Sequence, residues 1–286
     1  MRYLIKRNLL IFFRDKGSVF FSLLGVFVII GLYVLFLGDM MVKSMDDLPG
    51  VRFLMDSWIM AGLLAVTPIT TSLGAMSAII EDKRYGMYKD FATSPMRRST
   101  IAGGYIISGF LISLILTFLT FLLAEAYIVM YGGELLTIDA ALKVIVLIPF
   151  TAAASSIMMF YLVSWFKSVN AYSAASTIIG TLIGFLTGIY IPIGTLPASV
   201  QTVVKFFPPS HAAVLFRRIM MEQAEKVTFA GAPQEVLEEF HLELGAAFQV
   251  GNTVLRPYAS ILYILLFMIV FFILVLIKIT RKQAEL

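Results

Sequence analysis

Residues 259–277 read ASILYILLFMIVFFILVLI, a run of apolar residues without a charged side chain. A helix needs about 20 mostly apolar residues to cross the hydrocarbon core of a bilayer. Working outward from this run, five further stretches meet the same criterion: residues 18–37, 57–80, 105–130, 142–166 and 171–191. The sequence therefore predicts an all-α membrane protein with six transmembrane helices in a single domain, residues 1–286.

The composition supports this fold class. Of 286 residues, 59% are hydrophobic and 14% are charged, whereas soluble domains carry about 25% charged residues. The formal net charge is +4, but the basic residues flank apolar runs, which indicates contact with lipid and not with nucleic acid. The absence of cysteine excludes disulfides, thiolate catalysis and cysteine-based metal sites.

The distribution of Lys and Arg predicts the orientation. Basic residues are concentrated before the first span, in the loop after the second, and after the sixth, whereas the short loops on the other side hold few. Because short basic loops stay on the cytoplasmic side, both termini are expected to be cytoplasmic.

Two segments on that side have features beyond those of simple flanking segments. Residues 1–17 mix basic residues with Leu, Ile and Phe, which predicts an interfacial helix lying among lipid headgroups; a flank that only sets topology is the alternative. Residues 81–104 form a cytoplasmic loop that combines charges with Tyr85, Tyr88 and Phe91. Exposed aromatic residues on a short amphipathic element favour docking to another protein, and packing on neighbouring helices is the alternative.

The stretch after the fifth span is apolar but interrupted by Pro192, Pro197, Pro208 and Pro209. Its helical part is too short to cross a bilayer, which favours a re-entrant helical hairpin over residues 192–210. Residues 211–257 are then an extracellular segment.

Inside the spans, three features are candidates for function. The fifth span has small residues at a spacing of four, Ser176, Gly180, Gly184 and Gly188, a pattern typical of close helix packing either within the chain or in a dimer. Thr67 and Thr71 share one face of the second span and could line a substrate path or bond back to their own helix. Glu125 is an acidic residue within an apolar run, which makes it a candidate for substrate passage.

Several motifs are absent. The sequence has no G-x-x-x-x-G-K-[ST] and no H-E-x-x-H or G-x-S-x-G pattern. We therefore expect no enzyme activity, cofactor or metal in this chain. A polytopic protein without its own energy source needs a partner that supplies one.

The loop Glu81-Asp82-Lys83-Arg84-Tyr85-Gly86, followed by Thr93-Ser94-Pro95-Met96-Arg97-Arg98, resembles a segment of the permease subunits of ABC type-2 exporters, the group that includes daunorubicin-resistance permeases. The segment with Pro192, Leu196-Pro197 and Phe207-Pro208-Pro209-Ser210-His211 is similar to the proline-punctuated part of the same family. The resemblance covers nearly the whole chain.

The resemblance implies a permease in a bacterial plasma or inner membrane that pairs with a second copy or a paralogue. Cytoplasmic ABC ATPase subunits would bind ATP and Mg and dock on the interfacial helix and the loop after the second span. The docking candidates are Glu81, Arg84, Tyr85, Gly86, Tyr88, Phe91, Pro95 and Arg97. The outer gate candidates are Pro192, Pro197, Phe207 and Pro208.

The expected function is export of an amphiphilic substrate, such as a drug, an antimicrobial peptide or a lipid-linked molecule. Export of a polysaccharide or lipid-linked glycan by the same family is an alternative, and a membrane scaffold or sensor without transport is another. Residues 212–256 extend the family pattern with several glutamates, and their role is left open.

Overall fold

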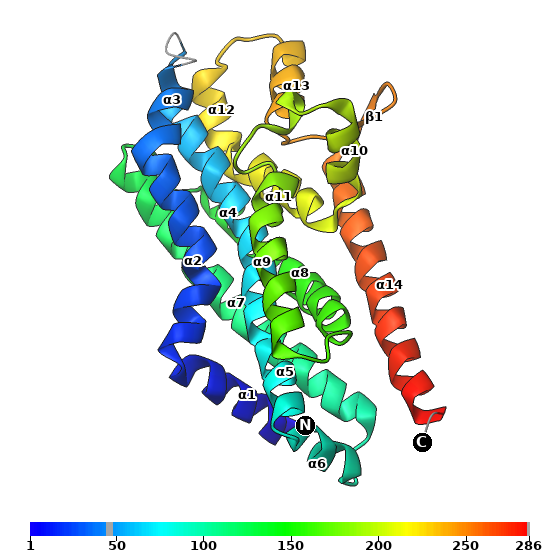
Figure 1. The fold of residues 1–286 in the computed structure, drawn as a ribbon. Helices are drawn as coiled ribbons and strands as arrows, with labels where there is room; N and C mark the ends of the chain where they lie inside the picture. The colour runs from blue at the N-terminus through cyan, green and yellow to red at the C-terminus, as the bar shows by residue number, and fades with distance from the viewer. Residues whose placement is uncertain (44–47, 285–286) are drawn as a thin grey trace.

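The computed structural model describes residues 1–43 and 48–284 and is an elongated helical bundle (Figure 1). Six helices within these ranges are long and apolar enough to cross a membrane: Lys16–Phe36, Val51–Arg84, Arg98–Met130, Ile138–Val163, Val169–Leu186 and Pro257–Thr280. The predicted all-α membrane fold with six spans is confirmed, with boundaries that differ by a few residues from those expected.

The bundle is assembled from the following elements, in chain order: α1 (Arg2–Arg14), α2 (Lys16–Leu32) with a π-helical turn (Tyr33–Leu37), α3 (Gly38–Lys43), α4 (Val51–Ala75), α5 (Ser77–Arg84), α6 (Met87–Thr93), α7 (Arg98–Met130), α8 (Ile138–Val163), α9 (Val169–Leu186), a 3-10 turn (Ile193–Thr195), α10 (Ala198–Phe206), α11 (Pro208–Met220), α12 (Glu222–Thr228), α13 (Gln234–Glu243), β1 (Gln249–Val250), β2 (Thr253–Val254) and α14 (Pro257–Ala284).

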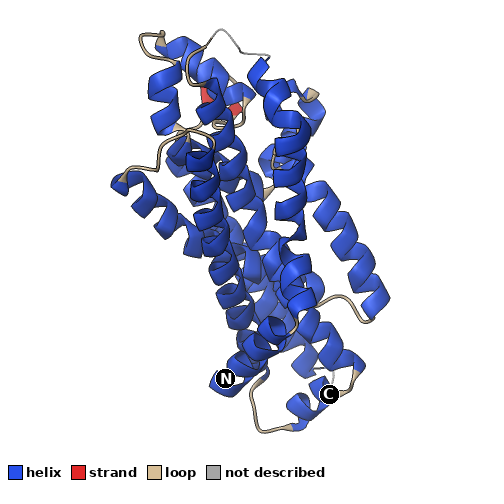
Figure 2. Ribbon diagram, turned by 90° about the vertical axis from the view of Figure 1, so that its left-hand side faces the viewer, coloured by secondary structure: helices blue, strands red, loops and turns tan. Residues whose placement is uncertain are grey.

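The two ends of the bundle differ in character (Figures 1 and 2). One end, called here the basal end, holds α1, the end of α5, α6 and the last turns of α14. The opposite end carries what we call the cap, formed by residues 193–256, in which α10, α12, α13 and a short antiparallel hairpin of β1 and β2 fold over the bundle while α11 packs into it. The strand pair is the one departure from an all-helical chain among the described residues.

Helix α4 forms the centre of the bundle. In its span 83% of the residues are buried, against 17% in the spans of α9 and of α14. Small residues explain how neighbours come so close: a Cβ on Gly62 would lie 2.8 Å from Ile189, and one on Gly74 would lie 2.2 Å from the Ser22 hydroxyl. Helices α9 and α14 are thus peripheral, with most of their apolar surface exposed.

Three segments have boundaries that differ from those expected from the sequence. Helix α4 begins at Val51, so Arg52 and Asp56 belong to it and pair at 3.2 Å. The segment 81–104, expected as a loop, is mostly helical: it holds the end of α5, all of α6 and the first turn of α7.

The hairpin after the fifth span also extends further than expected. It comprises α10 and α11, and α11 runs on to Met220, packed against α4, α8 and α14. Pro208 and Pro209 begin α11, where a missing backbone N–H has no consequence. Residues 211–220, assigned to an external segment from the sequence, are therefore buried in the bundle.

Candidate functional site

A long groove runs along one side of the bundle between α2 and α9, with α4 as its floor. Its volume is about 1240 Å³. Among its described lining residues Asp15 alone is ionisable at neutral pH, and it lies at the basal end. The walls are otherwise apolar side chains, small residues and hydroxyl groups: Phe21, Ser22, Gly25, Ile29, Thr70, Leu73, Gly74, Ser77, Tyr172, Ser173, Ser176, Thr177, Gly180, Thr181, Phe185 and Tyr190.

The groove stays open because α9 is held mainly near its two ends. Near the basal end, the Tyr172 hydroxyl donates to the Leu73 carbonyl at 2.6 Å. At the cap end, Ile189 packs against Gly62 and the Gly188 carbonyl accepts from Arg217 at 2.8 Å. A Cβ on Gly180, between these anchors, would meet no atom within 4 Å. The middle of α9 therefore borders open space.

The predicted stripe of small residues is divided between two environments. Ser176 and Gly180 border the groove, whereas Gly184 is buried against the Tyr190 ring and Gly188 ends the helix at φ 66. Gly184 and Gly188 thus serve packing within the chain, Ser176 is half-buried with its hydroxyl covered, and only Gly180 of the four is exposed.

Thr67, Thr71 and Glu125 do not border the groove in this conformation. Thr67 and Thr71 are fully buried and donate to the carbonyls of Leu63 and Thr67, at 2.7 and 2.6 Å, as the alternative interpretation had it. Glu125 accepts from the Leu136 N–H at 3.0 Å and so organises the turn between α7 and α8. Thr70, on the adjacent face of α4, borders the groove instead.

At the basal end, an ion pair joins α1 to the end of α5. Arg7 donates to both carboxylate oxygens of Asp82, one of them at 2.6 Å, and Asp82 is fully buried. The Tyr105 hydroxyl of α7 donates to the same carboxylate. The hydrogen bond to Asp82 raises the pKa of Arg7 above its ordinary value, so Arg7 stays charged at any physiological pH.

The same arginine reaches the next helix. Its guanidinium lies 5.7 Å from the centre of the Phe91 ring on α6. Beside it, the Asn8 side chain donates to the Ser108 hydroxyl of α7 at 3.1 Å. Helices α1, α5, α6 and α7 are thereby connected through residues on one face of α1.

The docking candidates fall into two groups. Glu81, Arg84, Tyr85, Pro95 and Arg97 are exposed, and Tyr85 has 67% of its surface accessible. Tyr88 and Phe91 are half-buried and pack on the core, which fits the alternative interpretation for these two. Gly86 has φ 80, a conformation suited to glycine, and turns the chain between α5 and α6.

At the cap end, Arg217 connects three segments. It is fully buried, and besides Gly188 it donates to the Gly245 carbonyl at 3.3 Å and lies over the Trp58 ring at 4.8 Å. Burial lowers its pKa. The gate candidates lie at helix starts in the same part of the chain: Pro192 and Pro197 precede the 3-10 turn and α10, Phe207 precedes α11, and Pro208 begins it.

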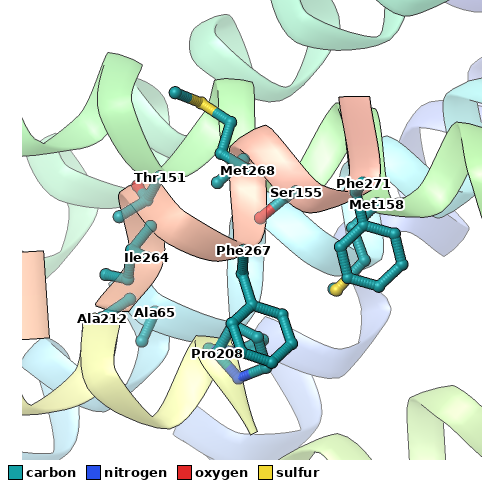
Figure 3. A pocket seen from close by; sticks show the side chains of 12 residues that line it. Ala65, Thr151, Ser155, Met158, Pro208, Ala212, Ile264, Phe267, Met268 and Phe271 are labelled. Carbon is teal, nitrogen blue, oxygen red and sulfur yellow. The ribbon is translucent and has the colours of Figure 1, made fainter. Parts of the chain in front are cut away.

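A second, small cavity lies where α14 meets α4, α8 and α11 (Figure 3). Ile264 and Phe267 of α14, Thr151 and Ser155 of α8, and Pro208 of α11 surround it. Its volume is about 20 Å³, about enough for one water molecule. It is a gap in helix packing and too small for a substrate.

The family described as "ABC-2 family transporter protein" matches residues 51–277, which is most of the chain. The chain belongs to the ABC-2 transporter family. No curated protein matched it.

Membership of this family establishes the general class of the protein. An ABC-2 permease is a non-catalytic, multi-pass membrane component of an ABC transporter and works with an ABC ATPase. The family match begins at Val51 and excludes α1 and α2, although these two helices supply Arg7 and one wall of the groove.

Sequence reasoning missed the Arg7–Asp82 pair and the groove walls on α2 and α9, and it did not place Arg217 at a contact of three segments. Asp82 lies within the motif that carried the family resemblance, yet its partner is far away in the sequence. The sequence does contain a signal for Arg217, because it lies in an amphipathic helix after a proline-rich turn. Arginine is seldom fully buried unless it is paired.

Proposed function

We propose that this ABC-2 permease is the membrane half of an ATP-driven exporter for an amphiphilic substrate. The groove between α2 and α9 carries the proposal. It is long, open to one side and lined by apolar and hydroxyl groups, with Asp15 as the one acid among its described lining residues, so it suits a molecule with an apolar body and uncharged polar groups.

A second copy of the chain, or a paralogue, would close the open side. The groove is bordered by α2 and α9, and two small residues of the stripe, the half-buried Ser176 and the exposed Gly180, line it. A groove that lacks one wall does not enclose a pathway across the membrane. Two grooves that face each other would form one enclosed pathway. Small residues along α9 allow the close approach that such a seam needs.

The basal end would face the cytoplasm and receive the ATPase. The exposed residues Glu81, Arg84, Tyr85, Pro95 and Arg97 form the contact surface in this proposal, with ATP and Mg bound by the partner. Asp82 beneath this surface pairs with Arg7, so a push on α6 would reach α1 and, through Asp15 at the start of α2, the wall of the groove.

A cysteine scan tests the pathway directly, because the chain contains no cysteine. Thr177→Cys places a thiol on α9 at the groove opening, and Leu266→Cys places one on the exposed face of α14. After mild oxidation in membranes, we expect a covalent dimer from Thr177→Cys and little from Leu266→Cys. Equal yields from both positions would contradict a seam at α9.

Co-purification tests the transport class. The tagged chain in mild detergent should bring down an ATP-binding subunit with vanadate-sensitive ATPase activity. A chain that purifies alone, without ATPase, would point to a scaffold or sensor instead.

Export of a lipid-linked glycan is a second candidate, favoured by one feature of the groove. Its lining includes the hydroxyl groups of Ser173, Thr177 and Thr181 and aromatic rings such as Phe21 and Tyr172, and sugar rings bind to surfaces that combine hydroxyl groups with aromatic rings. Stimulation of ATPase activity by a lipid-linked oligosaccharide but not by amphiphilic drugs would select this candidate.

A further inference from the structure

A polar cavity of about 440 Å³ lies in the cap, at the end of the bundle away from α1 and α6. The 3-10 turn, α10, α13 and β1 border it, and the last three lie together in Figure 1. It shares no described lining residue with the groove between α2 and α9. Helix α13 and strand β1 belong to residues 212–256, whose role the sequence left open.

The walls of this cavity are held in place by the chain itself. The Gln201 side chain of α10 donates to the Gly194 carbonyl of the 3-10 turn at 3.2 Å. A Cβ on Gly194 would lie 2.6 Å from the Cα of Glu243, so the turn and α13 are in backbone contact. The Phe248 ring, which is buried, belongs to a small apolar cluster beneath the cavity. The cavity is therefore formed before a ligand arrives.

Three charged side chains line the cavity from two helices. Lys205 of α10 is half-buried, and Glu239 and Glu243 of α13 are exposed. Within the described part of the chain, none of these three side chains has a hydrogen bond or an ion pair. One positive and two negative groups that the chain leaves without partners favour a ligand with the complementary charges.

Strand β1 adds unpaired backbone groups to the same site. Gln249 lies opposite Val254 of β2, and the Leu255 N–H donates to the Phe248 carbonyl at 2.7 Å. Because hydrogen-bonded and non-hydrogen-bonded pairs alternate in an antiparallel ladder, the N–H and C=O of Gln249 point away from β2. They have no backbone partner among the described residues, and Gln249 lines the cavity. An open strand edge of this kind can pair with an extended peptide.

The spacing of the two glutamates also suits an extended peptide. Glu239 and Glu243 are separated by one helical turn, so they share a face of α13 and lie about 6 Å apart along its axis. Alternate residues of an extended chain point to one side and lie about 7 Å apart. Basic side chains at alternate positions of a peptide would therefore reach both carboxylates.

We propose that this cavity binds a cationic peptide in an extended conformation. Two basic side chains contact Glu239 and Glu243, a carboxylate contacts Lys205, and the peptide backbone pairs with Gln249. The inference rests on the proposed function in one respect, the placement of the cap outside the cell. A polyamine shares the cationic chemistry and would use the same glutamates, but it has no peptide group for the strand edge and no carboxylate for Lys205.

Calorimetric titration of the full chain in phosphatidylcholine nanodiscs, without the ATPase, tests the site. The probe is the tetrapeptide KTKT with an acetylated amino terminus and an unmodified carboxylate. Three ligands are compared with it: KTKT with methylated backbone nitrogens, the peptide QTQT, and spermidine. The variants are Lys205→Gln and the double variant Glu239→Gln/Glu243→Gln. The matched control is Glu238→Gln, an exposed glutamate of α13 that is not among the described lining residues.

We expect KTKT to bind the unmodified chain more tightly than QTQT does. Its affinity should fall about threefold for each exposed ion pair removed, and so about tenfold in the double variant. Glu238→Gln should leave it unchanged. Methylation removes the N–H donors of the peptide and should weaken binding about fivefold. Thermal unfolding without ligand checks that the variants fold.

Three outcomes would overturn the proposal. The first is equal binding of KTKT to Glu238→Gln and to the double variant. The second is equal affinity for the methylated and unmodified peptides, because charge alone would then attract the ligand. The third is spermidine that binds at least as tightly as KTKT and is lost in the double variant, which would replace the peptide by a polyamine. Neither ATPase nor transport enters the measurement, so its failure is distinct from failure of the exporter function.

Discussion

At the scale of single residues, the Arg7–Asp82 pair gives the clearest prediction. Arg7→Ala leaves Asp82 fully buried with Tyr105 as its remaining partner among those described, and a buried charge that loses a partner costs about 1–3 kcal/mol. Arg14→Ala, at an exposed position of the same helix, should change stability by less than about 0.5 kcal/mol. Thermal unfolding in detergent measures both, and equal effects would contradict a structural role for the pair.

Asp82→Asn completes this comparison, because an amide oxygen can still accept from Tyr105 but the charge is gone. In the double variant Arg7→Ala/Asp82→Asn, the loss should be smaller than the sum of the two single losses, since the double variant leaves no unpaired buried charge, whereas Arg7→Ala alone does. Additive losses would show that the two side chains act independently.

His211 predicts how the cap responds to pH. Its Nε2 donates to the Lys205 carbonyl at 2.9 Å, so Nδ1 of the neutral ring accepts from the Ser260 hydroxyl at 3.0 Å. Burial lowers the pKa of His211 below its ordinary value. The unfolded chain therefore binds a proton at a pH where the folded chain does not, and stability falls as the pH drops below about 6.5.

His211→Gln keeps a donor and an acceptor but does not titrate. Unfolding temperatures recorded between pH 7.5 and 5 should decline less steeply in this variant than in the unmodified chain. His241, which contacts Glu225 at 2.8 Å, is present in both proteins, so the difference between the two profiles belongs to His211. An unchanged pH profile would show that His211 is not kept neutral by the fold.

At the scale of elements, α9 offers a matched pair of glycines. Gly188 has φ 66, and a Cβ there would lie 2.3 Å from Ile193, so Gly188→Ala should destabilise the chain by about 1–2 kcal/mol. Gly180 faces open space, and Gly180→Ala should be neutral or stabilising by up to about 1 kcal/mol. Thermal unfolding of both variants measures the two changes in stability. Equal losses of stability would mean that the middle of α9 is packed in solution.

The elements also show what sequence could predict. The six spans follow from local apolar runs, so their number and order were predictable from hydropathy alone. The groove was not, because it depends on which faces of α2 and α9 are turned toward each other. Likewise, α11 has the proline start of a surface hairpin, and its burial against α4 and α14 depends on contacts that no local pattern encodes.

At the scale of the whole molecule, the groove and the basal network make one mechanical prediction. If ATP binding at the basal end moves α1 and α6, α2 should move with them, since Asp15 joins α1 to α2 and its side chain accepts from Gly17 at 3.0 Å at the start of α2. The groove would then become less accessible near the basal end and more accessible near the cap end.

Because the chain contains no cysteine, single introduced cysteines report this change in accessibility. Ser18→Cys lies in the groove near the basal end and Phe185→Cys near the cap end. With the ATPase present, trapping by ATP and vanadate should slow the reaction of Ser18→Cys with a water-soluble maleimide and speed that of Phe185→Cys, each by at least about threefold. Leu266→Cys on α14 should react equally in both states. If the two groove positions change in the same direction, the groove opens or closes as a whole, and the basal network does not exchange access between its ends.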